Sequence, residues 1–356
     1  MTEAAQNPYE IILYYKYVDL ADPQGFVDWH KAVCANLNLK GRVLIAKEGI
    51  NGTLEGRVED TAEYCRLMHL QDGSEGTFAD FSDVVFKRSP GTGVAFPKLK
   101  VKLRDEVVSL KLSHGSDVNP NETTGIHLKA EDLKKWYETG EDFLIVDMRN
   151  DYEYKVGHFE GSINPKMTNF RDLPDVLPAL EEVKKASLEG KKIITVCTGG
   201  IRCEKASGFL MKNGFENVYQ LDGGMHTYME KFPGQDFNGA LYVFDGRETM
   251  AFTDDRQIIG RCIACDTATE QFTNCAHIRC HAKTLICGPC IKKSLAEART
   301  LVEENPAFGP VVNKILTEET SAFVFCSDEC RAAAMERIEK AAKASSAVPV
   351  AAIVGA

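Results

Sequence analysis

The sequence predicts an α/β chain of three successive parts. The first part has short β-patterned runs and two helical runs in the order β-α-β-β-α-β. The second alternates short apolar runs with helical ones, a pattern typical of a parallel sheet covered on both faces. In the third part, eight of the twelve cysteines gather between Cys262 and Cys330. We therefore expect domains at residues 1–112, 125–235 and 236–343, a linker at 113–124 and a disordered tail at 344–356.

Composition limits the class of protein. The chain has 356 residues, of which 44% are apolar and 26% charged, as in ordinary globular proteins. A formal net charge of −10 argues against binding nucleic acid through the overall field. No apolar run approaches the ~20 residues of a membrane span, and the first residues carry no export signal. We expect a cytoplasmic protein without membrane contact, in which cysteines serve as metal ligands or redox groups. Nothing in the sequence indicates how many subunits associate.

The first part reads as a ferredoxin-like sandwich. Gly49–Gly52 is expected to be a turn, because glycine and asparagine tolerate positive φ. The predicted helices are Pro23–Asn36 and Asp60–Met68. The predicted strands are Ile11–Tyr17, Gly41–Ala46, Thr53–Gly56, Val84–Lys87 and a stretch within Val101–Leu112.

A basic stretch lies near the end of this first part. Between Lys87 and Arg104 the chain carries six basic residues and no acidic one. Lys98, Lys100 and Lys102 recur at period two, which places them on one face of a strand. That face can follow the phosphate backbone of RNA. A solvated strand face without a ligand explains the pattern equally well.

The second part begins after a polar stretch rich in turn-forming residues. Its predicted helical runs are Lys129–Glu138, a turn at Asp151–Lys155, Leu173–Leu188 and a helix from near Glu204 to Asn213. Its predicted strands are Phe143–Val146, Ile193–Val196 and Val218–Leu221. Ligand sites of such sheets lie at the carboxyl ends of the strands.

Cys197 occupies such a position, directly after the strand ending at Val196. Its loop continues as Thr198, Gly199, Gly200, Ile201 and Arg202 before the next helix. Successive backbone N–H groups and the positive end of a helix then point at the sulfur and favour the thiolate. The two glycines let the backbone approach a group carried on the sulfur. The loop therefore predicts a nucleophilic cysteine.

The spacing of the arginine narrows the chemistry. A cysteine phosphatase needs an arginine six positions after the nucleophile, but Cys203 stands there and Arg202 comes one residue earlier. The shorter loop suits a single atom carried on sulfur better than a phosphoryl group. The pattern C-x-x-G-x-R resembles the active loop of rhodanese domains, which carry sulfur as a cysteine persulfide. An incidental cysteine in a strand-to-helix turn is the alternative.

Two further segments extend this resemblance. Asp147–Tyr154 followed by Gly157–Pro165 resembles the amino-terminal rhodanese signature. Ala46–Thr53 matches the first-domain motif of the tRNA wobble-uridine hydroxylases, whose members join an acylphosphatase-like domain, a rhodanese domain and a cysteine-rich tail. The resemblance covers roughly residues 8–335. It implies hydroxylation of the anticodon's first uridine to 5-hydroxyuridine, with molecular oxygen as co-substrate and the anticodon arm of tRNA as partner.

The remaining site residues have two interpretations each. Arg202 supplies a fixed positive charge near Cys197, or it forms an ion pair with Asp147 or Glu153. Cys203 is a resolving thiol that closes a disulfide with Cys197, or a buried apolar residue of the following helix. Asp147, Arg149 and His158 are expected to support the sheet edge and the loop.

The cysteine-rich part contains four close pairs, enough thiolates for two tetrahedral zinc sites. Spacing does not fix which pairs combine, and His277 or His281 can replace a thiolate. Reduced cysteines without metal are the alternative. The favoured groups are Cys262, Cys265, Cys287 and Cys290, and Cys275, Cys280, Cys326 and Cys330.

Three functions compete on the sequence alone. The first is a tRNA hydroxylase in which Cys197 adds to the uracil ring and makes the neighbouring carbon electron-rich. The second is a sulfurtransferase that works through a Cys197 persulfide. The third is a zinc-dependent scaffold with an inert rhodanese domain, which the intact Cys197 argues against. No flavin or nicotinamide motif is evident, since Gly223-Gly224 lacks the G-x-G-x-x-G spacing, and no iron triad is apparent.

Overall fold

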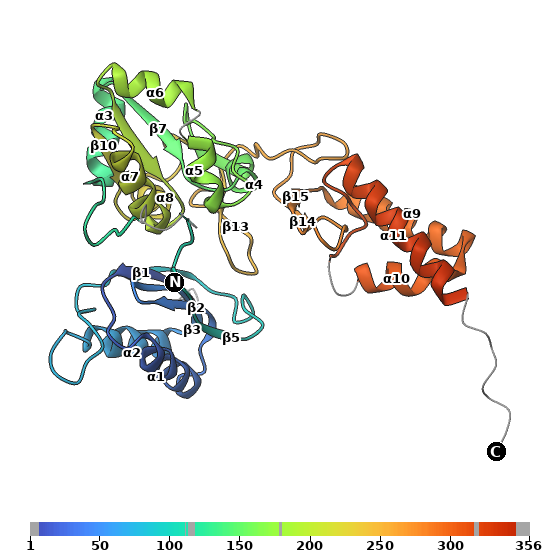
Figure 1. The fold of residues 1–356 in the computed structure, drawn as a ribbon, viewed down its shortest axis with the longest axis horizontal. Coiled ribbons are helices and arrows are strands. Elements are labelled where there is room, and N and C mark those ends of the chain that lie inside the picture. Colours follow the sequence, from blue (N-terminus) through green and yellow to red (C-terminus); the bar gives the residue numbers. More distant parts are fainter. Residues whose placement is uncertain (1–6, 111, 113–117, 178–179, 317–319, 347–356) are drawn as a thin grey trace, which may run out of the picture. The chain divides into compact units, whose positions relative to one another are not determined.

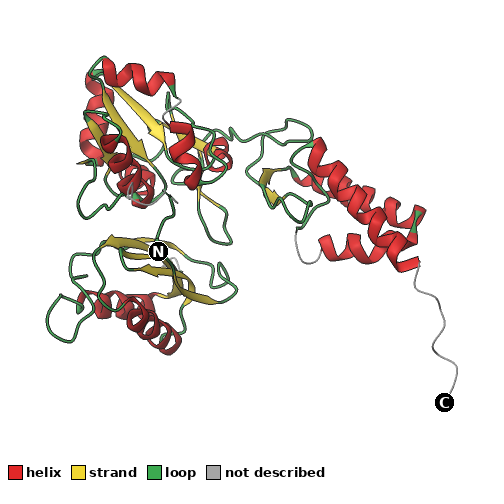
Figure 2. Cartoon of the chain, in the orientation of Figure 1, coloured by secondary structure: helices red, strands yellow, loops and turns green. Residues whose placement is uncertain are grey.

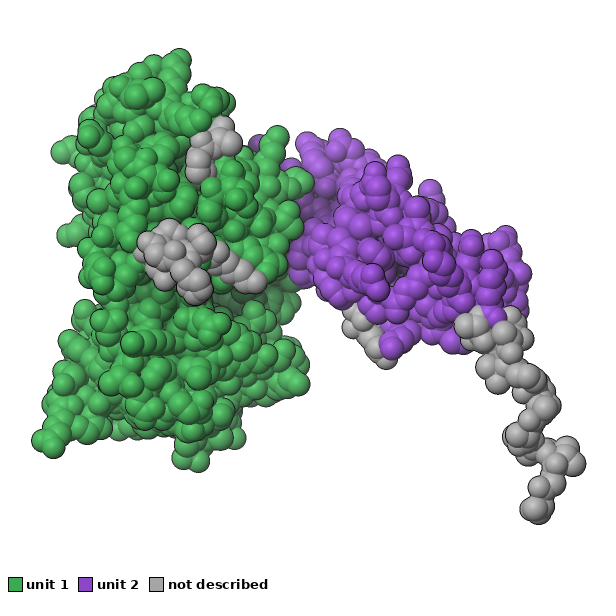
Figure 3. All heavy atoms as spheres, viewed as in Figure 1, with its two compact units in different colours: residues 1–256 green, residues 257–356 purple. Residues whose placement is uncertain are grey.

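A computed structural model describes residues 7–110, 112, 118–177, 180–316 and 320–346 (Figure 1). The chain divides into two compact units, residues 1–256 and 257–356 (Figure 3). The predicted linker, residues 113–124, lies partly outside the described residues. Among the helices of the described ranges, none combines the length and the apolar character that crossing a membrane requires.

The first domain is a five-stranded sheet in the order β4-β1-β3-β2-β5, with two helices on one face (Figure 2). Strand β5 runs parallel to β2, and the other pairs are antiparallel. The predicted β-α-β-β-α-β order and acylphosphatase-like fold are confirmed. The elements are β1 Tyr9–Tyr17, α1 Pro23–Asn36, β2 Lys40–Ala46, β3 Gly49–Arg57, α2 Val58–His69, β4 Lys87–Pro90 and β5 Leu99–Leu103.

Alternation along the strands gives this sheet two different faces. In β1, Ile12 and Tyr14 are fully buried and pack with the helices in the core. Leu13 and Tyr15 therefore point to the opposite face, because successive side chains of a strand alternate. That second face is turned toward the second domain, and it becomes a wall of the candidate site.

Several predicted boundaries of the first domain were wrong. The turn lies at Lys47-Glu48, and Gly49–Gly52 belongs to β3. The glycines serve close strand packing instead, since a Cβ on Gly49 would lie 2.1 Å from the carbonyl oxygen of Lys16. Helix α2 begins two residues before Asp60, and β4 and β5 are offset from the predicted strands.

The second domain is a parallel sheet in the order β6-β10-β9-β7. One face packs against α5, α6 and α7, and the other against α3 and α8, so the predicted doubly covered sheet is confirmed. Its elements are β6 Ile126–Leu128, α3 Ala130–Thr139, β7 Phe143–Asp147, α4 Asp151–Val156, β8 Gly157–Phe159, η1 Phe170–Asp172, α5 Leu173–Val176, α6 Glu181–Leu188, β9 Lys192–Val196, α7 Ile201–Lys212, β10 Val218–Leu221 and α8 Gly224–Lys231. The short strands β11 Phe237–Gly239, β12 Leu241–Tyr242 and β13 Thr249–Met250 follow.

Three features of this domain differ from the sequence prediction. Strand β6 was missed because it has only three residues and two of them are exposed. The predicted helix Leu173–Leu188 is split into α5 and α6. A break is expected at Leu177, because the residue before a proline disfavours the helical conformation. Pro178 itself lies outside the described residues. Helix α7 begins at Ile201, three residues before Glu204, directly after the positive φ of Gly200.

The second unit combines a small hairpin with three helices around their own core. Helix α11 extends to Ser346, past the predicted end of this region at Lys343. The rest of the predicted tail, residues 347–356, lies outside the described residues. The elements are β14 Phe272–Asn274, β15 Lys283–Leu285, α9 Gly288–Glu304, η3 Pro306–Phe308, α10 Gly309–Lys314 and α11 Asp328–Ser346.

Candidate active site

Cys197 is the first residue after β9, at the carboxyl end of the parallel sheet, and it is fully buried. The backbone N–H of Gly200 donates to its Sγ at 3.1 Å. Gly200 has a φ of 106°, a conformation that residues with a Cβ rarely adopt, and it lets the loop fold back on the sulfur. The carbonyl of Cys197 accepts from the N–H of Met225 at 2.9 Å, which ties the loop to α8.

The surroundings of Cys197 favour its thiolate. Burial alone raises the pKa of this thiol, because it penalises the charged form. The Cys203 thiol, the Arg202 charge and the N–H groups of Arg202 and Gly200 outweigh burial and lower the pKa of Cys197 to about 6. Burial and the adjacent Cys197 raise the pKa of Cys203. Cys197 is therefore the anionic member of the pair.

Arg202 forms a buried bidentate ion pair with Glu153 of α4. Its Nη1 and Nη2 donate to the two carboxylate oxygens at 2.7 and 2.9 Å. Nη2 also reaches Thr198 Oγ1 at 3.3 Å, and the guanidinium lies 5.5 Å from the ring centre of Phe244. Of the two expected partners, Glu153 and not Asp147 forms the pair. The charge of Arg202 still acts on the sulfur, while its donors hold the loop on α4.

Of the three residues expected to support the loop, Asp147 pairs in register with Val196, the residue before Cys197. Asp147, at the end of β7, accepts from Arg149 Nη2 at 2.6 Å, and the same nitrogen donates to the Gly157 carbonyl at 2.6 Å. His158 stacks on Tyr154 with ring centres 3.9 Å apart. Within the described part of the chain, none of the three lines the cleft that contains Cys197. Their supporting role stays a prediction.

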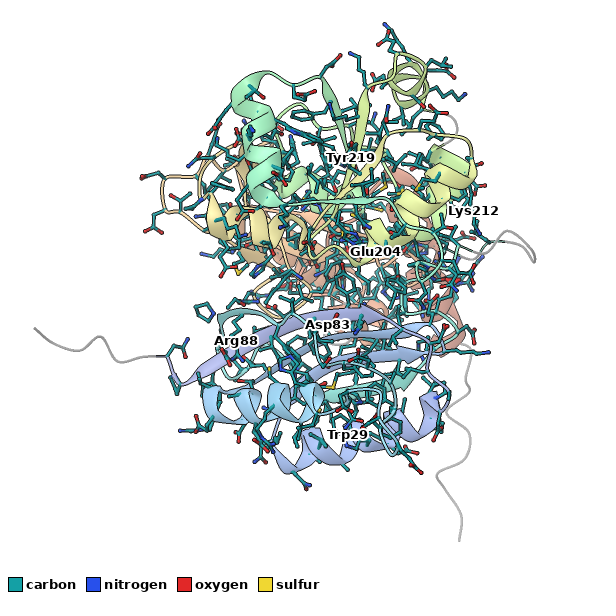
Figure 4. All side chains as sticks on the ribbon, turned by 90° about the vertical axis from the view of Figure 1, so that its left-hand side faces the viewer. Trp29, Asp83, Arg88, Glu204, Lys212 and Tyr219 are labelled. Atoms are coloured by element: carbon teal, nitrogen blue, oxygen red, sulfur yellow. The ribbon has the colours of Figure 1, made fainter. Side chains whose placement is uncertain are left out.

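The first domain is in direct contact with the cysteine loop. A Cβ added to Gly199 would lie 3.1 Å from Leu13 Cδ2, and one on Gly200 would lie 2.7 Å from the Tyr15 hydroxyl. That hydroxyl donates to Glu204 Oε1 at 3.2 Å, and Figure 4 shows Glu204 on the side of its domain that faces the first-domain strands. Gly199 and Gly200 are thus needed for two reasons: a side chain at either position would crowd β1, and the loop must fold closely around the sulfur.

A cleft of about 290 Å³ opens beside the sulfur, close to the lower end of the ~300–1,000 Å³ typical of small-molecule sites. Its lining comes from the cysteine loop, from α8, from the hairpin at Val243–Met250 and from the strands of the first domain. The first domain contributes Leu13, Tyr15, Arg42, Leu44, Asn51 and Thr53, among others. A planar ring entering the cleft would meet both domains.

A basic stripe leads from the sheet edge toward this cleft. Lys98, Lys100 and Lys102 are all exposed, and the last two lie in β5. Lys100 pairs in register with Arg42 of β2, so the two side chains share a face of the sheet. Arg42 is exposed and lines the cleft. The predicted period-two face therefore continues across β2 to Cys197.

The clustered cysteines form two groups of four in the second unit. The groups are Cys262, Cys265, Cys287 and Cys290, and Cys275, Cys280, Cys326 and Cys330, the same sets that the spacing favoured. Within each group the ligand atoms lie within 4.8 Å of one another. The sulfurs of Cys265 and Cys287 are 3.6 Å apart, near the ~3.8 Å that a tetrahedral site with Zn–S bonds of ~2.3 Å requires. Each group can hold a metal ion, and neither includes His277 or His281.

Comparison with known proteins places these features in a family. Family models match residues 9–107 as a UPF0176 acylphosphatase-like domain, 129–231 as a rhodanese-like domain and 238–300 as a rhodanase C-terminal region. A tRNA uridine(34) hydroxylase of Bacillus cereus is 40% identical over 339 residues, covering 94% of this chain and 99% of the relative. A relative of the same name from Staphylococcus aureus is 42% identical and covers 78% of this chain and 84% of its own length. Another from Enterococcus faecalis is 40% identical and covers 87% of this chain and 95% of its own length.

The chain belongs to the tRNA uridine(34) hydroxylase family. The name shared by these relatives favours the hydroxylase interpretation over a sulfurtransferase. The first two matched segments together contain the strands and the loop that wall the cleft, so the site of this tRNA uridine(34) hydroxylase family member is built from both domains.

Sequence reasoning missed the polar residues that surround the loop of this family member. Buried Glu204 accepts from Tyr15, from Thr124 at 2.7 Å and from Gln220 at 2.8 Å, and it contacts His127 at 3.0 Å. His226 and Arg247 line the cleft as well. These residues come from separate segments without a shared motif. In the sequence, a charged Glu204 two residues after Arg202 is a signal that could have pointed to them.

Proposed function

We propose that this protein hydroxylates the wobble uridine of tRNA to 5-hydroxyuridine with dioxygen, and that Cys197 attacks the substrate. The geometry that supports this most is the Cys197 thiol, which accepts from the Gly200 N–H at 3.1 Å and lines a cleft of about 290 Å³. The surroundings also lower the pKa of this thiol to about 6. Family membership supports the substrate, because relatives named for uridine 34 of tRNA match up to 94% of the chain. Such a substrate places the enzyme in the cytoplasm.

The thiolate gives the uracil ring the reactivity it lacks. Addition of Sγ to C6 forms a carbon–sulfur bond and moves the C5=C6 electron pair toward C5 and the O4 carbonyl. C5 then becomes the electron-rich position at which oxygen is incorporated. Loss of the C5 proton and departure of the thiolate restore the aromatic ring with a hydroxyl at C5. Reduction of the second oxygen atom to water consumes two electrons from an external reductant.

The roles of the loop follow from its contacts. The N–H groups of Gly200 and Arg202 contact the thiolate, and Arg202 adds positive charge. For Thr198, Gly199 and Ile201, a place in the N–H cradle remains part of the proposal. Cys203 is fully buried in the apolar core beside Cys197, which supports its interpretation as a packing residue that also stabilises the thiolate. We keep the resolving-thiol role as the alternative for Cys203.

The basic stripe is the proposed contact with the anticodon arm. Lys98, Lys100, Lys102 and Arg42 present positive charge on the face of the first-domain sheet that ends at the cleft. A phosphate backbone following these side chains would deliver the unpaired anticodon base to Cys197.

We propose zinc as the metal of both cysteine groups, because four thiolates within 4.8 Å match the donor set of structural zinc sites. The metal would stabilise the fold of residues 257–346 and takes no part in the chemistry at Cys197.

Mass spectrometry of tRNA nucleosides tests the function. Cells with the gene should contain 5-hydroxyuridine at the wobble position, cells without it should lack it, and Cys197→Ala should fail to restore it. Unaltered tRNA in the deletion strain, together with rapid thiosulfate:cyanide turnover by the purified protein, would instead support the sulfurtransferase.

A further inference from the structure

His226, on α8, is a buried histidine without the hydrogen bonds that such a residue normally makes. It is 4% exposed, and its Nδ1 is buried without a partner among the described residues. The nearest carboxylate oxygen, on Glu230, lies 4.0 Å from Nδ1, beyond hydrogen-bond distance. Buried polar groups in native proteins are nearly always paired. His226 therefore has a ring nitrogen that no described protein group satisfies.

The position of His226 is fixed relative to Cys197. Its backbone N–H donates to the Thr198 carbonyl at 3.0 Å, beside the bond from Met225 to the Cys197 carbonyl. Gly224 has a φ of 67°, and a Cβ there would lie 2.6 Å from the Cys197 carbonyl oxygen. This close approach allows α8 to start against the loop. The side chains of His226 and Cys197 line the same cleft.

The electrostatic setting of His226 suits a negatively charged oxygen. Burial lowers the pKa of His226 to about 4, and the charges of Lys87 and Arg247 act in the same direction. The imidazole is therefore neutral near pH 7, with one N–H to donate. Arg247 is held by Asp245 at 2.6 Å. Lys87 is 9% exposed and lies over the ring of Tyr15, with no ion pair to a described residue. Burial lowers the pKa of Lys87, whereas the charges of Cys197, Asp222 and Glu230 act to keep it protonated. When charged, Lys87 and Arg247 both act against a proton on His226 and can stabilise an anion beside it, while Asp245 and Glu230 partly offset them.

The addition step creates such an anion. When the Cys197 thiolate bonds to C6, the C5=C6 electron pair moves through C5 and C4, and negative charge develops on O4 as an enolate. No oxidant or reductant takes part in this step, and departure of the thiolate returns the pair to the ring. Among the described residues of the site, the groups that hold the thiolate do not account for stabilisation of the charge on O4.

We propose that His226 is a catalytic residue that donates a hydrogen bond to O4 of the uracil as the enolate forms. Lys87 of the first domain acts through His226 as a positioning residue and supplies positive charge when protonated. The inference rests on the proposed function and extends it, because it assigns the group that stabilises the charge produced by Cys197.

The test is trapping of the covalent intermediate. The probe is an anticodon stem-loop RNA with 5-fluorouridine at the wobble position, whose fluorine makes C6 more electrophilic. The full-length protein should form an RNA adduct that survives denaturing electrophoresis, and Cys197→Ala should form none. His226→Leu should slow adduct formation about 100-fold, as loss of one oxyanion donor does. His226→Gln, which keeps an N–H donor, should recover part of the rate. Lys87→Met should slow it, and Lys87→Arg should restore it.

Three readouts separate the outcomes. Iodoacetamide should alkylate Cys197 in His226→Leu at the wild-type rate, which excludes a displaced loop, and the thermal midpoint should show that the variant folds. Adduct formation by His226→Leu at the wild-type rate would overturn the inference and leave the hydroxylase function standing. Formation of 5-hydroxyuridine by the wild type without any adduct would overturn the inference together with the covalent step. Failure of the wild type to hydroxylate unmodified RNA with oxygen and reductant would reject the proposed function itself.

Discussion

Cys197 and Cys34 are both fully buried thiols in the same unit, and their surroundings give them opposite chemistry. Cys34 packs in the apolar core of the first domain, where burial raises its pKa to about 12. Cys197 has the same burial, but backbone N–H groups, Arg202 and Cys203 lower its pKa to about 6. Donors aimed at the sulfur, and not its exposure, therefore decide whether a buried cysteine in this protein is reactive.

The eight cysteines of the second unit add a third environment. Their sulfurs lie close to one another within each group of four, as in the 3.5 Å contact between Cys280 and Cys326. Four thiols that close together repel one another as anions unless a cation lies between them. Grouped thiols can thus share a metal ion, whereas the Cys197 thiolate is held by backbone N–H groups and, among the described residues, belongs to no such group of sulfurs.

Replacement of Cys197 should have the largest effect. Cys197→Ala removes the nucleophile, so 5-hydroxyuridine formation should fall at least ~1,000-fold. Cys34→Ala is the matched control, since it removes an equally buried thiol and should leave activity within a few-fold. Quantitative mass spectrometry of the nucleosides measures both. Equal losses in the two variants would break the comparison.

Metal removal tests the grouped thiols. Purified protein should contain about two zinc ions per chain, and less than ~0.5 would reject the sites. Structural zinc contributes on the order of 10 kcal/mol to the folding of small domains. A strong chelator should therefore make residues 257–346 sensitive to protease while the Cys197 alkylation rate stays unchanged. Elemental analysis and limited proteolysis give the two readouts.

The buried Arg202–Glu153 pair tests what holds the reactive loop. Glu153→Gln leaves the guanidinium buried without its anionic partner and should lower the free energy of unfolding by about 3–5 kcal/mol. Glu181→Gln breaks an exposed pair with Lys184 and should cost less than ~0.5 kcal/mol. Urea denaturation compares the two. Similar values would show that the buried pair does not stabilise the loop.

The pH dependence sharpens the contrast between the two buried thiols. Alkylation of Cys197 should rise about tenfold per pH unit below pH ~6 and level off above it, while Cys34 stays unreactive at neutral pH. The folded-state pKa of Cys197 is below the ~8.5 of an unfolded thiol, so the unfolded chain binds more protons between these values. The stabilisation of the folded state by the ionised Cys197 is complete above pH ~8.5 and is lost as the pH falls through about 6. Unfolding of the wild type and of Cys197→Ala at pH 6 and 8.5 measures the difference. An alkylation inflection near 8.5 would contradict the assignment.

The smallest expected effect concerns delivery of the substrate to the sulfur. Replacing Lys98, Lys100 and Lys102 by alanine should weaken RNA binding about tenfold and reduce the salt dependence of binding by up to three phosphate contacts. Exposed Lys135 and Lys185, replaced together, are the control. An unchanged salt slope in the triple variant would show that the stripe is an ordinary solvated strand face.

The sequence was most informative where one local pattern determines the structure. Strand β10 and helix α1 have the predicted bounds, and the Cys197 loop lies where a strand-to-helix turn was expected. Short spacings between cysteines predicted the four pairs, and the structure brings them together in the two favoured groups, a choice that spacing alone left open.

The rest depends on contacts between distant segments. Tyr15 reaches Glu204 across 189 residues, and nothing near either residue signals the other. His226 looked like any helical histidine until the structure placed it beside the loop and without a partner. The glycines of β3 resemble a turn locally, yet their absent side chains make room for Tyr14 and for the Lys16 backbone.

The contact of Leu13 and Tyr15 with the glycines of the cysteine loop has a consequence for how such enzymes diverge. The second domain contains the groups that ionise the sulfur, while the first domain forms the opposite wall of the cleft. Substitutions at the cleft-lining positions of β1, β2 and β3 can therefore alter which molecule reaches Cys197 without disturbing the segment that ionises it. Chemistry and selectivity are inherited on separate stretches of the chain, and either can change while the other is preserved.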